Sequence, residues 1–132
     1  MVAHLEEFLY GFFRLPEDGD PQAPPDDAEI SRAVAFLKQS GTTVTADLAT
    51  YQAIAAQWGK PEQVQDYLRL PAAHYLSPGD RIDWRRSGYQ RRTGSLDRRA
   101  VFLGRFVSAL SASGVPLIAG TDAPTIAWAG SW

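Results

Sequence analysis

The chain has 132 residues, 45% of them hydrophobic and 21% charged, with a formal net charge of −2 and no cysteine. This composition is typical of a globular domain and excludes a disordered tail, disulfides, iron–sulfur clusters and thiolate zinc sites. The slightly acidic balance makes nucleic acid an unexpected partner. We find no secretory signal and no apolar run long enough to span a bilayer, so no membrane association is expected. The compartment stays open, with the cytoplasm as the default.

The N-terminal part is expected to contain a strand stub and a long loop. Residues 2 and 3 form the stub, and His4 follows it directly. Residues 8–13 are apolar and aromatic, which fits a short helix or a buried loop. Residues 15–27 are rich in Pro, Asp and Gly and predict an exposed loop.

A helix that leads into a strand is expected next. Asp26 and Glu29 fit a capping box, apolar residues recur at helical spacing, and Gly41 is placed to end the helix. The β-branched residues 42–45 then predict a short strand. Helix, glycine and strand in this order are half of a βαβ unit, so the pattern favours an α/β fold with a parallel sheet.

The middle of the chain predicts further helices. Residues 51–58 and 61–70 have helical patterns, and Pro61 stands where the first turn tolerates proline. Another helix is expected from a cap at Ser77 or Asp80 to about residue 86.

The last unit repeats the helix–glycine–strand order. Ser95 can cap a helix with an apolar face, Gly114 ends it, and residues 115–119 form a continuous apolar run. Such a run predicts a strand buried on both faces. Asp122 follows it closely.

Asp122 and His4 are the candidate metal-binding residues. α/β folds place their active sites at the carboxyl ends of parallel strands, where a carboxylate can bind a metal ion and accept a proton from water. On position alone, Asp122 as a turn or helix cap is an equally good interpretation. A lone histidine is more often structural, but His4 and Asp122 together favour a metal site, which would still need a third protein ligand.

Four segments, in order along the chain, resemble the metal-dependent amidohydrolases, in the branch similar to imidazolonepropionases and prolidases. These segments are AHLE (3–6), GTTVTADLATY (41–51), LPAAHYLSP (70–78) and SGVPLIAGTDAP (113–124). The GTDAP ending after a buried strand is the most specific of them. Ala46 and Asp47 stand where the family usually has Pro-Thr, and His74 stands where it usually has Arg.

The resemblance implies strands six to eight of a TIM-type (β/α) barrel with flanking helices. His4 matches the metal-binding histidine of strand six, and Asp122 matches the strand-eight aspartate that binds metal and acts as the catalytic base. The implied cofactor is a divalent metal, with zinc expected. The implied reaction is hydrolysis of an amide or other carbon–nitrogen bond in a small-molecule or peptide-like substrate.

The other family ligands, including the His-x-His pair of strand one, have no counterpart here. A complete barrel needs roughly 250 residues. We therefore expect residues 1–132 to be a single fragment of the barrel that is inactive alone and binds metal weakly or not at all. Its exposed sheet edges predict self-association.

Two other interpretations compete with this one. Seven arginines between residues 81 and 99, interleaved with Trp84 and Tyr89, fit an RNA- or phosphate-binding patch, although a solvated helix face balanced by aspartates is favoured. Alternatively, the chain is a small non-catalytic α/β module, or a relic, derived from an amidohydrolase.

Overall fold

The computed structural model describes residues 1–15, 20 and 23–121, and it is a mixed α/β structure that is mostly helical. The elements, in chain order, are α1 (Glu7–Gly11), α2 (Ala28–Ser40), β1 (Val44–Ala46), α3 (Leu48–Gln57), α4 (Pro61–Arg69), the 3₁₀ turn η1 (Pro71–Tyr75), α5 (Pro78–Arg86), the 3₁₀ turn η2 (Tyr89–Arg91), α6 (Asp97–Ala112) and β2 (Leu117–Ala119).

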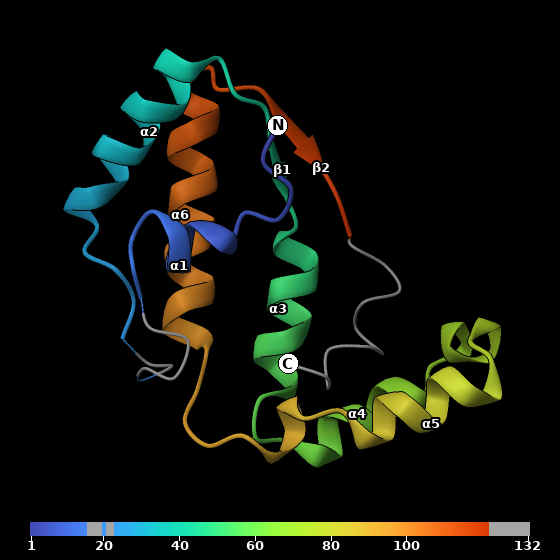
Figure 1. Ribbon diagram of the computed structural model, residues 1–132. Coiled ribbons are helices and arrows are strands. Elements are labelled where there is room, and N and C mark those ends of the chain that lie inside the picture. Colours follow the sequence, from blue (N-terminus) through green and yellow to red (C-terminus); the bar gives the residue numbers. More distant parts are fainter. Residues whose placement is uncertain (16–19, 21–22, 122–132) are drawn as a thin grey trace.

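Helix α6 is the centre of the core. Figure 1 shows it between α2 and α3, and it contacts both, whereas α4 and α5 extend to one side. Phe102 and Phe106 on α6 are fully buried. The Phe106 ring packs edge-on against Phe8 and Phe13, with ring centroids 5.4 and 5.5 Å apart. An aromatic cluster therefore joins the N-terminal segment to α6.

Two equivalent corners connect a helix to a strand. Gly41 ends α2 with φ of 62°, and Gly114 follows α6 with φ of 74°, a left-handed conformation that favours glycine. Thr42 N–H donates to the Leu37 carbonyl at 3.3 Å, and Val115 N–H donates to the Leu110 carbonyl at 3.0 Å. The same six-residue closing hydrogen bond thus ends both helices and turns the chain into a strand.

The strands are short, parallel and ordered around β1. Val44 pairs with Leu117 of β2 on one side and forms a parallel bridge to Val2 on the other. Thr45 N–H donates to the Val2 carbonyl at 2.9 Å, and Val44 N–H donates to the Pro116 carbonyl at 3.0 Å. Three segments far apart in sequence therefore lie edge to edge, with their carboxyl ends on one side.

Most expected elements are confirmed, with shifts at their ends. The strand predicted at 42–45 lies at 44–46, and the helix predicted from residue 51 begins at Leu48. Ser77 caps α5 in a capping box with Asp80. The capping box predicted for Asp26 and Glu29 is wrong, because the Asp26 side chain accepts a hydrogen bond from Ala28 N–H at 2.9 Å, whereas Glu29 N–H donates to the Asp26 backbone carbonyl.

The expectation that the last strand is buried on both faces is also wrong. Val115 is buried, but Ile118 in β2 is 46% exposed and Ala119 is exposed too. Within the described residues β2 has a strand neighbour on one edge only, which is β1.

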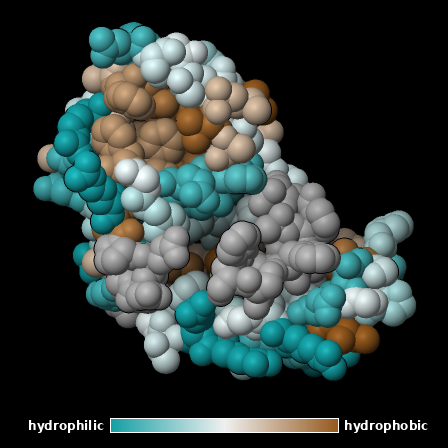
Figure 2. All heavy atoms as spheres, in the orientation of Figure 1, coloured by the Kyte–Doolittle hydropathy of each residue, from teal (hydrophilic) through white to brown (hydrophobic). Residues whose placement is uncertain are grey.

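Figure 2 shows hydrophobic surface gathered over the upper half of one face. No helix in the described part of the chain is long and apolar enough to cross a bilayer.

We expect Phe106→Ala to destabilise the chain by about 3–5 kcal/mol, because it removes a fully buried ring and leaves a cavity. Val101→Ala, on the same helix at a position 56% exposed, is the matched control and should change stability by less than about 0.5 kcal/mol. Urea unfolding followed by circular dichroism measures both. Equal losses would contradict the placement of α6 at the centre of the core.

Candidate functional site

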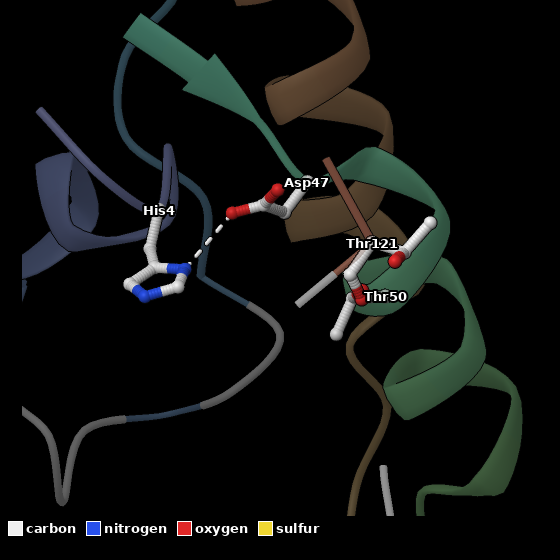
Figure 3. A network of polar contacts seen from close by, with 4 residues as sticks. All are labelled: His4, Asp47, Thr50 and Thr121. Carbon is white, nitrogen blue, oxygen red and sulfur yellow. Dashed lines mark hydrogen bonds and ion pairs between the residues drawn. The ribbon is translucent and has the colours of Figure 1, made fainter. Parts of the chain in front are cut away.

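Polar side chains meet at the carboxyl ends of the parallel segments. His4 follows the Val2 bridge, and Asp47 directly follows β1. His4 Nδ1 lies 2.9 Å from Asp47 Oδ2, although the two residues are 43 positions apart in sequence. Figure 3 shows the two side chains pointing toward each other. Parallel pairing therefore builds a histidine–carboxylate pair at this edge of the sheet.

Asp47 stands at the N-cap position of α3, but its side chain caps nothing. No side-chain hydrogen bond to the first turn of α3 is present, although aspartate at this position usually makes one. The carboxylate turns to His4 instead. The positive end of the helix dipole still favours a negative charge there. The orientation of Asp47 thus serves the histidine contact rather than the start of the helix.

Asp47 is also buried. Its side chain is 2% exposed, against 38% for that of His4. Asp47 Oδ1 is inaccessible to solvent and has no hydrogen-bond partner among the described residues. A buried carboxylate is costly unless it is paired, so His4 is an important stabilising partner of Asp47.

The backbone of His4 is strained. Its φ is 66°, in the left-handed region that non-glycine residues seldom adopt. His4 also leads directly into α1, because Glu7 N–H donates to the His4 carbonyl at 3.1 Å. Strain of this kind persists where the surrounding structure enforces it, and it clusters at functional sites.

The end of β2 closes against the same pair. A Cβ added at Gly120 would collide with the Asp47 carboxylate and would lie 2.7 Å from Cγ2 of Thr45. The hydroxyl of Thr50, 3% exposed, donates a hydrogen bond to the Thr121 carbonyl. These contacts bring β2 and α3 together beside Asp47, and they require a residue without a side chain at position 120.

Glu6 is electrostatically linked to this pair. Burial raises the pKa of the Glu6 carboxyl above its ordinary value, while its own backbone hydrogen bond and the charge of His4 oppose the rise. The negative charge of Asp47 adds to the increase. Glu6 therefore holds its proton to a higher pH than an exposed glutamate does.

The two residues predicted from the sequence have different outcomes. His4 follows the Val2 bridge, as predicted for its position, and its role as a metal ligand stays a prediction. Asp122 lies outside the described residues. Asp47 appeared in the sequence only as a departure from the family pattern, and its role as partner of His4 was missed. The usable signal was its position directly after a β-branched strand.

The described residues contain no group of three or more His, Cys, Asp or Glu side chains able to hold a metal ion. His4 supplies an imidazole nitrogen, and Asp47 supplies a buried carboxylate behind it. Imidazole and carboxylate groups are ligands that zinc accepts. The His4 imidazole therefore suits a metal ion, and Asp47 suits the place of a partner behind a ligand. The described part of the chain does not complete a catalytic ligand set.

The basic segment that runs from α5 to the first turn of α6 has a structural explanation for its aromatic residues. Trp84 stacks on Tyr67 and Tyr89 stacks on Trp58, each with ring centroids 5.9 Å apart. Arg99 is not on a solvated face as expected. It is 3% exposed, and its guanidinium donates to the backbone carbonyls of Asp20 and Ala23. These contacts favour packing over recognition of bases.

Comparisons of the chain with protein-family models, curated proteins and solved structures each found no match.

Gly120→Ala should destabilise the chain by about 1–3 kcal/mol, because the new methyl group must displace the Asp47 carboxylate. Gly104→Ala is the control. An added Cβ meets nothing there, and alanine within α6 should stabilise the chain by up to about 1 kcal/mol. Thermal and urea unfolding of both variants measure the difference. A neutral or stabilising Gly120→Ala would show that β2 does not close on Asp47.

Proposed function

We propose that this chain forms part of a metal-dependent hydrolase acting on amide or other carbon–nitrogen bonds, with His4 and Asp122 as metal ligands. One observation carries the proposal. Parallel segments place their carboxyl ends at one edge, and the histidine there is held by a buried carboxylate. α/β folds build their active sites at such edges.

The described fold supports a partial (β/α) barrel as the architecture. The chain contains two helix–glycine–strand units, α2 with β1 and α6 with β2, and β1 has parallel neighbours on both edges. Exposed apolar residues on β2, including Ile118, suit a strand that would have further neighbours in a closed barrel. The same exposed edge supports self-association of the chain.

The chemistry follows from the donor groups. A bound divalent metal, with zinc the best match to His and Asp ligands, supplies Lewis acidity that makes water a nucleophile near neutral pH. His4 offers a ring nitrogen to the metal. The Asp122 carboxylate would help to hold the metal and would accept a proton from water. The substrate class is a small molecule or a peptide-like compound with a hydrolysable carbon–nitrogen bond.

The metal ligands can be tested by titrating the chain with Co²⁺, whose ligand-field absorbance reports coordination. We expect weak, saturable binding that His4→Asn and Asp122→Asn each weaken by at least about tenfold, because loss of even an outer-shell partner typically costs that much. Asparagine tolerates the left-handed backbone of residue 4, so the substitution adds no backbone strain there, and circular dichroism checks that the variant is folded.

His74→Asn is the matched control, because His74 is exposed and is the other histidine of the two in the chain. It should leave the titration unchanged. In the protein expressed from its natural locus, Asp122→Asn should abolish hydrolysis while the circular dichroism spectrum is retained. Co²⁺ binding that is indifferent to His4 and Asp122, or hydrolysis that Asp122→Asn retains, would overturn the proposal in favour of a non-catalytic binding module.

A further inference from the structure

We infer that Asp47 is a positioning residue for His4: its carboxylate holds the proton on Nδ1, so that Nε2 is the ring nitrogen offered to a metal ion. The inference rests on the proposed function for the metal. It concerns a residue that the family pattern does not supply, since Asp47 occupies a position where the family usually has threonine.

The first step is the tautomer of the imidazole. His4 Nδ1 lies 2.9 Å from Asp47 Oδ2, and a carboxylate oxygen accepts hydrogen bonds, so we infer that Nδ1 carries the proton and donates it to this oxygen. In the neutral ring Nε2 then carries the lone pair, and only a lone pair can bind a metal. A free imidazole in water prefers the opposite tautomer, with the proton on Nε2. Asp47 therefore selects the form that presents Nε2.

The second step concerns why Asp47 orients the histidine and is not itself a metal ligand. The residue is 2% exposed, and Gly120 packs so closely that a Cβ added there would collide with the Asp47 carboxylate. Oδ1 is inaccessible to solvent, and Oδ2 is engaged by His4. His4, with 38% of its side chain exposed, is the more accessible member of the pair. The carboxylate lies behind the ring, where an orienting group belongs.

The third step separates this role from a purely structural one. An aspartate that only starts α3 would hydrogen-bond to the first turn of the helix, and Asp47 does not. Helix capping does not account for the orientation of the Asp47 carboxylate, whereas the hydrogen bond to His4 does.

Long-range ¹H–¹⁵N NMR of the imidazole nitrogens tests the inference, at a pH well above the ordinary histidine pKa of about 6.5. We expect His4 to be protonated on Nδ1 in the wild type and mainly on Nε2 in Asp47→Ala. His74, which is exposed, provides an internal reference that stays protonated mainly on Nε2 in both proteins. Added Zn²⁺ should shift Nε2 of His4 and leave its Nδ1 proton in place.

Two further variants keep the test decisive. Asp47→Asn preserves the shape of the side chain if Asp47→Ala does not fold, and its neutral oxygen, a weaker acceptor, should lower the Nδ1-protonated fraction. Thr50→Val removes the neighbouring hydrogen bond to the Thr121 carbonyl without touching His4, so it should leave the tautomer unchanged. Zn²⁺ should bind Asp47→Ala about 10–100-fold more weakly than the wild type.

The outcomes separate the inference from the proposed function. A wild-type His4 protonated on Nε2, or an Nδ1 proton that persists in Asp47→Ala, overturns the inference and leaves the metal proposal standing. Zn²⁺ bound through Nδ1 also overturns it. The expected tautomers without any Zn²⁺ effect on His4 overturn the proposed function and, with it, the metal-orienting part of the inference.

Discussion

Parallel pairing on both edges of β1 is the constraint from which the site follows. Val44 contacts Val2 on one side and Leu117 on the other, so three segments drawn from the beginning, middle and end of the described chain share one direction. Parallel strands need helical crossovers, and α6 with its aromatic cluster provides the core on which they pack. The residues that follow each strand segment therefore lie together at one edge of the sheet.

Burial then determines how the collected groups interact. Asp47, at the end of the central strand, is removed from water, and a buried carboxylate without a partner would cost several kcal/mol. The hydrogen bond with His4 compensates part of that cost. The close packing of Gly120 against the Asp47 carboxylate keeps water away from it. The backbone of His4 is left-handed, a conformation that non-glycine residues seldom adopt. A strained, partly exposed histidine on a buried carboxylate is an arrangement suited to holding a ligand, and this is why the proposal centres on it.

Local signals in the sequence predicted much of this fold. The glycines at 41 and 114 end their helices as expected, Pro61 begins α4, and Ser77 caps α5, because each depends only on neighbouring residues. The exposure of β2 was not predictable, since an apolar run reports what a strand can bury and not what covers it. The same limit hid the partner of His4. Asp47 is an ordinary helix-start residue in sequence, and only parallel pairing brings it to a histidine 43 positions away.

The most direct measurement is the anomalous diffraction of crystals of the chain grown with Zn²⁺. The account predicts a zinc peak about 2.0–2.1 Å from Nε2 of His4 and about 2.0–2.2 Å from a carboxylate oxygen of Asp122, with Nδ1 still on Asp47. A zinc ion on Nδ1, or zinc bound elsewhere, as at His74, with no peak near His4, would contradict the assignment of a metal site to this edge of the sheet.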